Sequence, residues 1–496
     1  MFKKILIANR SEIAVRVIRA CHELNIEAVA IYSDVDRDAL YVRMADEAYY
    51  IGKPQPLESY LNMNKIIDIA KLCNAEAIHP GYGFLAENTE FAKKVMDAGI
   101  VFIGPSPSSV QAMGDKISAR RLASSAGVTI VPGTIDPVKD AARAKKIASE
   151  IGYPVMLKAV NGGGGKGMRL VEKEEDIESA FERASSEALS AFGDGSVYIE
   201  KYIKNPRHIE FQILGDKHGN IIHLNERECS IQRKHQKLIE ESPSTVITPE
   251  KRTKVGAMAV AAARAAGYYN AGTIEFIMDQ DGELYFMEMN TRLQVEHPVT
   301  ELTTGIDIVK EQIRIADGQR LNYNQSDIKI TGHAIECRIV AEDPLRDFVP
   351  TPGKIVYLRE PQGIGIRLDS GVYEGYEVSS WYDSLIAKLQ AYGKDRKEAI
   401  ARMVRALDEY KILGISTSIP LYKWIFKHSR FISGDINTGF LEQEINNFSL
   451  DISRFEDIVA AVSAISSIGQ KNISELNTQR VFDNKWKFAG RLRNLQ

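Results

Sequence analysis

The first 114 residues alternate short apolar runs with helical apolar patterns, and this alternation limits the fold more than any other feature of the chain. Behind Ser11, a suitable N-cap, Ile13, Val17 and Cys21 recur at helical spacing. Buried strands are expected at residues 3–8, 28–32, 75–78 and 101–104. Strands that alternate with helices in this way form parallel sheets. The sequence therefore predicts a parallel α/β domain over residues 1–114.

The chain has 496 residues, which is too long for one hydrophobic core, because such cores stop growing at roughly 250–300 residues. Hairpins and helices mixed over residues 115–330 predict a two-lobed α+β nucleotide-binding module. Short strands and then a helix predict a third domain, of mixed α/β structure, over residues 331–446. Residues 447–496 form a C-terminal extension with an apolar helical stripe, which would either dock a partner subunit or cap the third domain.

Composition argues against several classes of protein. The formal net charge of −3 gives no general attraction to nucleic acid or membranes, and no run of about 18 apolar residues predicts a membrane span. The cysteines Cys21, Cys73, Cys229 and Cys337 are far apart and include no CxxC pair, which argues against a zinc site or a disulfide framework. Scattered thiols, and a first strand in place of a signal peptide, predict a cytoplasmic protein.

A glycine run follows the strand expected at residues 155–160. Gly162 to Gly165 would let backbone N–H groups approach phosphate oxygens without Cβ clashes, and Lys158 and Lys166 add positive charge. No Ser or Thr follows a Gly-Lys pair, so this is not a P-loop of the GxxxxGK(S/T) type. The flanking strands and the two lysines favour phosphate binding over the alternative, a flexible surface loop.

Two acidic residues and an amide lie on an expected β-hairpin. A four-residue turn at residues 279–282 would pair Glu275 with Phe286. Glu288 would then lie diagonally from Glu275, about 7–8 Å away at the backbone, with Asn290 on the same face. Such oxygen ligands suit Mg²⁺ that is bound partly through substrate phosphates. We favour a metal site over an acid-rich, solvent-facing strand, because the acids adjoin aromatic residues.

The segment after this hairpin contains Arg292, Gln294 and Glu296 at alternate positions, so all three would project to one side of a strand. Arginine can bind a planar carboxylate or bicarbonate with two hydrogen bonds, and glutamine can bind the same anion. Glu296 could then act as a general base. An ordinary polar strand end is the alternative, and the position directly after the expected metal ligands favours function.

Two other segments are ambiguous. Residues 226–237 hold several basic groups in an expected short loop, which would be either a solvated patch or a means of neutralising triphosphate and bicarbonate. The loop at residues 79–88 follows the carboxyl end of a strand, where α/β sheets commonly bind ligands. Taken alone, that loop is more simply explained as a Pro-Gly turn.

Together these segments resemble the biotin carboxylase family, a class of ATP-grasp enzymes, over residues 2 to about 446. The resemblance implies a Rossmann-like N-terminal domain, an ATP-grasp domain with a mobile lid at residues 131–203, and a barrel-sandwich-like C-terminal domain. Ordered agreement over so many segments is far more specific than one glycine loop. The matching segments are Glu288-Met-Asn-Thr-Arg-Leu-Gln-Val-Glu-His-Pro298 and residues 5–10, 12–14, 78–88, 114–116, 162–168 and 227–232.

The resemblance also implies roles for single residues. The ATP contacts would be Lys116, Lys158, Gly164, Gly165, Glu200, Lys201, Tyr202, Ile203, His208 and His235. The ligands of two Mg²⁺ or Mn²⁺ ions would be Glu275, Glu288 and Asn290. The bicarbonate pocket would be Lys237, Arg292, Gln294 and Val295, with Glu296 as the base that deprotonates bicarbonate. Arg338 would face the biotin ureido oxygen and stabilise the enolate form, and Tyr82 would lie beside biotin.

Such an enzyme is a ligase that activates bicarbonate with ATP as carboxyphosphate and transfers the carboxyl group to biotin. The chain contains no Met-Lys-Met attachment segment, so biotin is expected on a separate subunit, a carrier or carboxyltransferase protein. A homodimer within a larger complex is expected. A separate carboxylase with this tail resembles the A subunits of two-subunit pyruvate carboxylases, and the carboxylase subunits of acetyl-CoA or propionyl-CoA carboxylases are the alternative.

Two rival interpretations and three departures from the family pattern remain. Another ATP-grasp ligase would share the phosphate loop and metal pair but has no reason to contain Tyr82 or Arg338. A non-catalytic nucleotide-binding subunit would be expected to lose the base or a metal ligand. Ser11 stands where the family usually has glycine, and Lys166 and Lys234 stand where it often has arginine, which affects only the fine geometry around phosphate.

Overall fold

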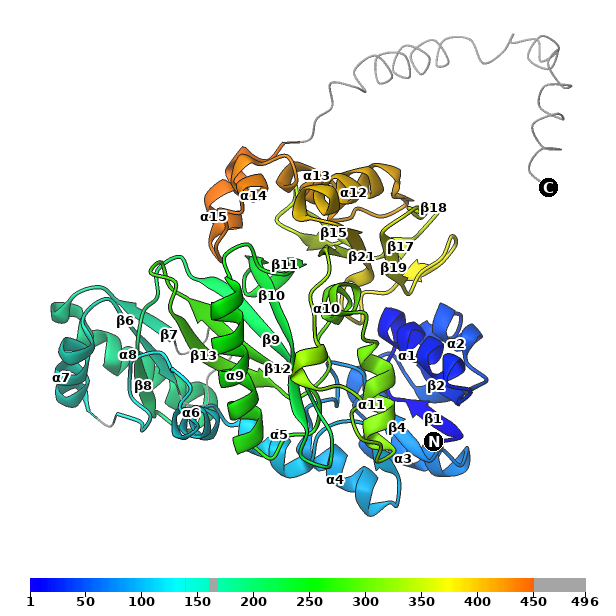
Figure 1. The fold of residues 1–496 in the computed structure, drawn as a ribbon, viewed down its shortest axis with the longest axis horizontal. Helices are drawn as coiled ribbons and strands as arrows, with labels where there is room; N and C mark the ends of the chain where they lie inside the picture. Colours follow the sequence, from blue (N-terminus) through cyan, green and yellow to red (C-terminus); the bar gives the residue numbers. More distant parts are fainter. Residues whose placement is uncertain (139, 160–167, 450–496) are drawn as a thin grey trace, which may run out of the picture. The chain divides into compact units, whose positions relative to one another are not determined.

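The computed structural model describes residues 1–138, 140–159 and 168–449, and residues 1–446 form one compact unit. Its N-terminal part is a five-stranded sheet with the order β3-β2-β1-β4-β5, in which all neighbours are parallel (Figure 1). The strands are β1 (Lys4–Ile7), β2 (Glu27–Ser33), β3 (Glu47–Gly52), β4 (Ala77–His79) and β5 (Val101–Phe102). The helices are α1 (Ser11–Glu23), α2 (Leu40–Met44), α3 (Met63–Leu72), α4 (Thr89–Asp97) and α5 (Pro107–Gly114). The predicted parallel α/β fold is confirmed.

The start of α1 differs from the prediction at Ser11. Arg10 occupies the N-cap position without a capping side-chain bond, and Ser11 is the first helical residue. Ser11 has a φ of 59°, in the left-handed region that favours glycine. This backbone conformation gives a physical reason for the glycine of the family pattern at this position.

Eight antiparallel strands form the central sheet, with the order β13-β12-β9-β10-β11-β14-β21-β19. They are β9 (Arg207–Gly215), β10 (Ile221–Arg233), β11 (Gln236–Ser242), β12 (Asn270–Met278), β13 (Leu284–Asn290), β14 (His333–Val340), β19 (Ile366–Ser370) and β21 (Leu385–Gly393). β11 pairs with β14 through residues 239–242. The sheet therefore continues across residue 330, where a domain boundary is predicted, and joins strands from both sides of it.

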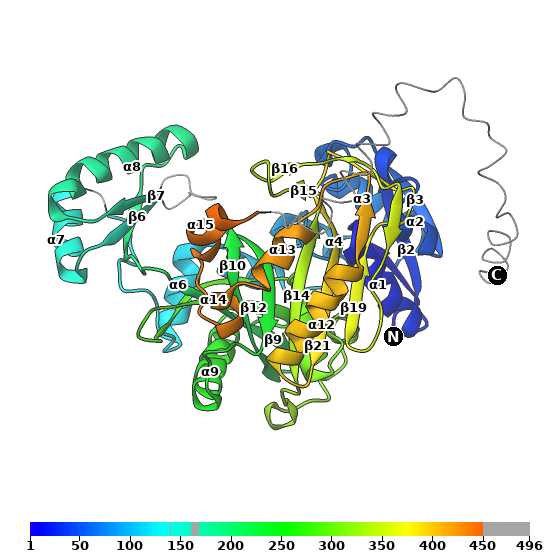
Figure 2. The ribbon, with the colours of Figure 1, turned by 90° about the horizontal axis from the view of Figure 1, so that it is seen from above.

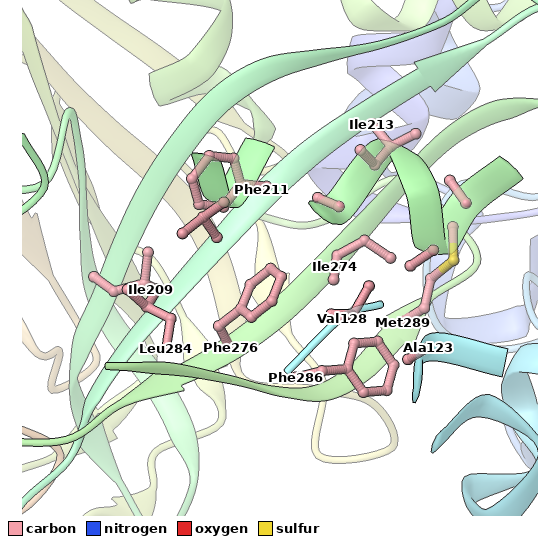
Figure 3. Close-up of a cluster of buried hydrophobic side chains, with 14 of the residues drawn as sticks. Ala123, Val128, Ile209, Phe211, Ile213, Ile274, Phe276, Leu284, Phe286 and Met289 are labelled. Carbon is pink, nitrogen blue, oxygen red and sulfur yellow. The ribbon is translucent and has the colours of Figure 1, made fainter. Parts of the chain in front are cut away.

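One face of the β9–β12–β13 part of the sheet is apolar. Ile209, Phe211 and Ile213 of β9 pack there beside Ile274 and Phe276 of β12 (Figure 3). The helices α6 (Lys116–Ser125) and α9 (Pro249–Ala265) contribute to the same buried cluster. Because side chains alternate along a strand, the polar residues between these apolar ones lie on the opposite face.

The predicted register of the β12–β13 hairpin is wrong. Phe286 pairs with Phe276, and after a register shift Glu288 pairs directly with Glu275. The shift is a β-bulge at Met287, which inserts one unpaired residue into β13. Phe286 therefore enters the apolar core, whereas Glu288, only two residues later, lies on the opposite face with Glu275. Without the bulge, regular alternation would place both residues on one face.

A second, three-stranded sheet lies within the predicted lid. Its order is β7-β6-β8, and its strands are β6 (Val155–Ala159), β7 (Met168–Val171) and β8 (Val197–Lys201). The helices α7 (Ala141–Ile151) and α8 (Ile177–Phe192) pack on this sheet around a separate apolar cluster (Figures 1 and 2). The predicted glycine run falls in residues 160–167 and, like residues 450–496 of the C-terminal extension, lies outside the described residues.

The C-terminal part adds α12 (Arg396–Glu409), which packs across β21 and β14 (Figure 2). The remaining strands form two-stranded sheets: β15 (Glu342–Asp343) with β16 (Val349–Pro350), β17 (Gly353–Lys354) with β20 (Glu377–Val378), and β18 (Tyr357–Arg359) with β22 (Lys411–Leu413). The remaining helices are α10 (His297–Thr304), α11 (Ile308–Ala316), α13 (Ile419–Ile425), α14 (Ser429–Ser433) and α15 (Phe440–Glu444). None of the helices in the described ranges is long and apolar enough to cross a membrane. All four cysteines are described, free and buried.

Glu241 of β11 ties α12 to the central sheet. Its Oε2 lies 2.7 Å from Nε2 of His333 and accepts a hydrogen bond of 2.7 Å from Nε of Arg396. Burial alone would raise the pKa of Glu241, but the hydrogen bond with His333 and the charge of Arg396 outweigh burial and lower this pKa to about 2. The ionised carboxylate therefore stabilises the folded state.

We expect Glu241→Gln to lower the free energy of unfolding by roughly 3 kcal/mol at pH 7, as the pKa difference between unfolded and folded states implies. Because the folded-state pKa is depressed, this stabilisation is present above the unfolded pKa, near 4.5, and disappears as the pH falls toward 2. Urea unfolding at several pH values would measure it, with the exposed Glu377→Gln as control. If the free energies of unfolding of wild type and Glu241→Gln differ by the same amount at pH 3 and at pH 7, the lowered pKa of Glu241 is contradicted.

Candidate active site

A cavity of about 1170 Å³ lies where the polar face of the central sheet meets the N-terminal domain and the β6–β8 sheet. Tyr82 lines it from the N-terminal domain, Lys158 from β6, Glu275 from β12 and Arg338 from β14. Segments that are far apart in the sequence, and for which a common site is predicted, therefore converge on one cavity.

Most of the predicted site residues line this cavity. They are Tyr82, Lys116, Lys158, Glu200, His208, His235, Lys237, Glu275, Glu288, Asn290, Arg292, Gln294, Val295 and Arg338. Among the described residues, four predicted ones are not part of the lining: Lys201, Tyr202, Ile203 and Glu296. Gly164 and Gly165 fall outside the described residues. Glu296 lies directly behind the lining and contacts two residues that belong to it.

Lys237 of β11 is surrounded by carboxylates. Its Nζ donates to Oε2 of Glu210, to Oε1 of Glu275 at 2.9 Å and to Oε1 of Glu296 at 2.7 Å. Burial alone would lower the pKa of Lys237, but the three carboxylates outweigh burial and raise this pKa well above its usual value. Side-chain atoms of His208, Glu210 and Glu275 lie close enough together to hold a metal ion. Lys237 already supplies a positive charge to this acidic cluster.

Glu275 and Glu288 face each other across β12 and β13. Burial, and next the charge of Glu275, raise the pKa of Glu288. Burial alone would also raise the pKa of Glu275, but Lys237 and His208 outweigh it and lower this pKa. The charge of Glu275 in turn affects His208. Burial alone would lower the pKa of His208, but the charge of Glu275 outweighs burial and raises this pKa to about 9. With the side chain of Asn290, which donates to Glu275 at 2.8 Å, the two carboxylates fit a divalent cation, because a cation would offset their repulsion.

Arg292, Gln294 and Glu296 do not lie on a strand end as predicted. β13 has already ended, and the chain turns into α10, with Glu296 as the N-cap residue. Nη1 of Arg292 donates to Oε1 of Gln294 at 3.1 Å, and Nε2 of Gln294 donates to Oε1 of Glu275 at 2.9 Å. The side chains therefore converge because the backbone turns, and not because strand residues alternate.

Arg338 contacts two carboxylates. Its Nε donates to Oε1 of Glu240 at 2.5 Å, and its Nη2 donates to Oε2 of Glu296 at 2.9 Å. Glu296 is fully buried and lies between Lys237 and Arg338. Burial alone would raise the pKa of Glu296, but Lys237 and Arg338 outweigh it and lower this pKa. Glu296 is therefore a carboxylate near neutral pH, placed beside the cavity.

Residues 226–237 do not form the predicted loop. They are the end of β10, a turn at Lys234 and His235, and the start of β11. Both turn residues have positive φ values, which a tight hairpin turn requires. Arg227 is fully buried, and its Nε donates to Oε1 of Glu210 at 2.5 Å. This part of the segment is an internal support for the site and not a solvated patch.

The loop at residues 79–88 is more than a Pro-Gly turn. Tyr82 lines the cavity, and its hydroxyl group donates to Oε1 of Glu12. Oε2 of Glu87 accepts a hydrogen bond of 2.9 Å from Nε of Arg292. The loop therefore connects the N-terminal domain with the arginine beside the acidic hairpin.

On the other side of the cavity, Glu200 of β8 binds both Lys158 and Arg120. The neighbouring side chain of Lys201 points elsewhere, because its Nζ donates to the backbone carbonyls of Gly152 and Tyr153 at 2.8 and 3.1 Å. Lys158 therefore lines the cavity while it is paired with a carboxylate. Lys201 instead binds the backbone between α7 and β6.

Sequence reasoning missed Glu210 and Glu240. Glu210 lies two residues after His208 on β9, so the period-two rule could have indicated it. Glu240 carries no local signal, because its partner Arg338 lies 98 residues away in sequence. Only the pairing of β11 with β14 brings these two residues together.

Comparison with known families covers most of the chain. Residues 1–110 match the N-terminal domain of biotin carboxylase, residues 115–324 the ATP-binding domain of the carbamoyl-phosphate synthase L chain, and residues 336–443 the biotin carboxylase C-terminal domain. The chain is 57% identical to the A subunit of pyruvate carboxylase from Methanothermobacter thermautotrophicus, over 89% of this chain and 90% of that protein. The chain belongs to the biotin carboxylase family. The predicted enzyme class, an ATP-dependent ligase, is confirmed.

Other biotin carboxylases are nearly as similar. The small subunit of 2-oxoglutarate carboxylase from Hydrogenobacter thermophilus is 53% identical over 94% of this chain and 98% of that protein. The crystal structure of a biotin carboxylase domain dimer of 2-oxoglutarate carboxylase from the same organism, in complex with MgADP, ADP and bicarbonate, has a TM-score of 0.85. It is 54% identical and covers 90% of this chain and 99% of that one. The biotin carboxylase fold is therefore shown, with the predicted N-terminal, ATP-grasp and C-terminal parts.

Proposed function

We propose that this biotin carboxylase uses MgATP and bicarbonate to carboxylate biotin on a separate carrier protein, as the A subunit of a pyruvate carboxylase. The main support is the position of Glu296, a buried carboxylate held between Lys237 and Arg338 at the edge of the cavity. The same cavity is lined by the acidic hairpin and by Lys116 and Lys158. A base, two cations and a site for a nucleotide phosphate are thus next to one another.

In the first step, bicarbonate would bind near Arg292, Gln294 and the backbone of Val295, which all line the cavity. Glu296 would accept the bicarbonate proton as a bicarbonate oxygen attacks the terminal phosphorus of ATP, and ADP would leave. Lys237 would offset negative charge at this point, because its ammonium group remains protonated. The product of this step is carboxyphosphate.

In the second step, carboxyphosphate would break down to CO₂ and phosphate, this phosphate would accept the N1 proton of biotin, and N1 would attack CO₂. Arg338 would stabilise the negative charge that forms on the ureido oxygen of biotin. Tyr82, on the same cavity, would lie beside the biotin ring. The predicted lid, which includes β6 to β8, would exclude water from the labile intermediate.

Glu275, Glu288 and Asn290 would hold the Mg²⁺ that accompanies ATP, and this ion would offset charge on the transferred phosphoryl group. We expect Glu288→Gln to raise the Mg²⁺ concentration for half-maximal ATP cleavage by about tenfold or more, because it removes one anionic ligand. A Mg²⁺ titration of ATP cleavage measures this shift. The exposed neighbour Glu283, changed to Gln, should leave it unaltered, and an unchanged Mg²⁺ requirement in Glu288→Gln would reject this ligand set.

The parent complex is a separate part of the proposal. The similarity to the A subunit of an archaeal pyruvate carboxylase supports pyruvate as the final acceptor, whereas the similarity to the 2-oxoglutarate carboxylase small subunit favours 2-oxoglutarate as a second candidate. The crystal structure of the latter as a dimer supports the expected homodimer. Mn²⁺ in place of Mg²⁺ and a cytoplasmic location also remain predictions.

Two assays would test the proposed function. Purified protein should cleave ATP in a bicarbonate-dependent manner, and free biotin should stimulate this cleavage and become carboxylated; a lack of any biotin effect would reject biotin as the acceptor. The chain should then be combined with its biotinylated partner protein and supplied with pyruvate, 2-oxoglutarate or acetyl-CoA. Carboxylation of pyruvate alone supports the pyruvate carboxylase assignment. Carboxylation of 2-oxoglutarate or of acetyl-CoA would reject this assignment and identify the parent complex as the corresponding carboxylase.

A further inference from the structure

Arg338 is held from two sides by carboxylates on different elements. Nε bonds to Glu240 of β11, and Nη2 bonds to Glu296 at the start of α10. Nη1 makes no hydrogen bond with any described residue, while Arg338 itself lines the cavity. The guanidinium group therefore has two edges engaged by protein and one nitrogen left for a substrate oxygen.

The two carboxylates do not have equivalent tasks. In the proposed reaction Glu296 accepts a proton from bicarbonate and loses its charge, so its ionic bond with Arg338 weakens during the cycle. Glu240 is buried like Glu296, but it is not hydrogen-bonded to Lys237 or to any other described residue of the proposed bicarbonate pocket, so it takes up no proton in this step. An arginine held by Glu296 alone would lose its charged partner just when negative charge forms on biotin.

The strand register fixes Glu240 in this position. Glu240 pairs directly with Glu336 across β11 and β14, and Arg338 lies two residues beyond Glu336 on the same face. Nε2 of Gln390 on β21 donates to Oε2 of Glu336 at 2.7 Å. Oε2 of Glu240 and Oε1 of Glu336 are buried without a hydrogen-bond partner among the described residues. Within the described part of the chain, Arg338 is thus the one cation that is hydrogen-bonded to Glu240.

We propose that Glu240 is the positioning residue of Arg338: it holds the guanidinium group by Nε, so that Arg338 keeps its orientation toward biotin when Glu296 takes up a proton. This inference rests on the biotin carboxylation proposed above and adds a residue to it. Glu240 touches neither ATP nor bicarbonate in this scheme, because it acts only through Arg338.

The charge of Glu240 is sensitive to pH. Burial raises the pKa of Glu240 to about 7, with Arg338 acting against burial and the charge of Glu296 acting with it. Burial also raises the pKa of Glu336 well above its usual value, with Lys388 and Arg338 acting against burial, and Glu336 is hydrogen-bonded to Gln390 and not to Arg338. The titratable groups that face Glu240 are Arg338, Glu336 and Cys337 on β14, Lys237 on β11, Cys229 on β10, Tyr422 on α13, and Glu296. As the pH falls through 7, Glu240 loses the charge that attracts Arg338.

The test compares two activities of the same protein: carboxylation of free biotin, and bicarbonate-dependent ATP cleavage without biotin. We expect Glu240→Gln at pH 8 to lower the first by about tenfold more than the second, as expected when a charged hydrogen bond to an arginine is lost. In wild type, kcat/KM for biotin should decrease as the pH is lowered through about 7. This decrease, the acidic limb of the pH profile, should be absent in Glu240→Gln.

Glu241→Gln is the matched control. Glu241 is the next residue on β11, is equally buried, and binds His333 and Arg396 on the opposite face of the sheet. It should lower stability without changing the ratio of the two activities. Glu240→Asp, which keeps the charge, should retain the acidic limb and provides a second measurement if Glu240→Gln does not fold.

Equal losses of both activities in Glu240→Gln or Glu240→Asp, or an activity ratio that matches Glu241→Gln, would overturn the assignment of Glu240. These outcomes are distinct from failure of the proposed function. If wild-type protein carboxylates no biotin, the function itself is rejected; if wild type is active and the ratio does not change, only the role of Glu240 is rejected.

Discussion

Glu296→Gln is expected to lower bicarbonate-dependent ATP cleavage by about a hundredfold or more, the usual contribution of a general base. The amide has nearly the shape of the carboxylate, and its one oxygen can keep the contact with either Lys237 or Arg338, but it cannot accept the bicarbonate proton. Because Glu296 is buried behind the cavity lining and does not line it, ATP should still bind. Steady-state kinetics with bicarbonate as the varied substrate, and calorimetric titration with ATP, measure the two effects separately.

The control for this variant is Glu283→Gln, the same chemical change at an exposed residue at the start of the β13 hairpin. It should leave both turnover and ATP affinity close to wild type. Turnover of Glu296→Gln near the wild-type rate would reject the role of Glu296 as base. A loss of ATP binding together with turnover would show instead that Glu296 supports the nucleotide site through Lys237.

The hairpin that contains Glu275 and Glu288 shows what sequence patterns can and cannot determine. The pattern predicts both strands and the approach of the two acids, because each depends on local periodicity, but the turn is one residue longer than predicted, since Met278 pairs with Leu284. The register depends on this longer turn and on the bulge at Met287, each of which shifts the pairing by one residue; the bulge leaves no compositional signal. The acids are consequently opposite each other and not diagonal, which brings them closer together than predicted.

The support of the site was less predictable than its lining. The resemblance to the family implies roles for Lys237, Arg292 and Arg338, and the structure brings all three to one cavity. Glu240 could not be found in this way, because its importance arises from the pairing of β11 with β14 across a predicted domain boundary. Pairings between strands so far apart in sequence are set by packing of the whole sheet and have no short-range pattern.

The burial of residues 226–237 cannot be decided from the sequence for a related reason. A run with several basic residues normally lies in water, since burying an unpaired charge is costly. Here Arg227 is buried because Glu210, Gln212, Thr273 and Thr300 accept hydrogen bonds from it. These acceptors come from β9, β12 and α10, so the compensation for burial becomes visible only once the strands and helix are assembled.

Arg338→Gln is the second variant with a large expected effect. We expect carboxylation of free biotin to fall by about a hundredfold, the size of loss that follows removal of one oxyanion-stabilising donor. Biotin-independent ATP cleavage should fall much less, because bicarbonate activation uses Arg292, Lys237 and Glu296. Some loss is still expected, since Nη2 of Arg338 helps to keep Glu296 ionised. Parallel assays of carboxybiotin formation and phosphate release measure the ratio.

Arg346→Gln, a change at an exposed arginine between β15 and β16, is the control for this variant and should alter neither activity. If Arg338→Gln lowers both activities equally, Arg338 acts on bicarbonate activation or on folding, and its free Nη1 has no special relation to biotin. If only biotin carboxylation falls, the cavity contains two functions that can be separated by mutation. Bicarbonate activation would then depend on the residues around Lys237, and carboxyl transfer on Arg338, which is held by Glu240 of β11 and by Glu296.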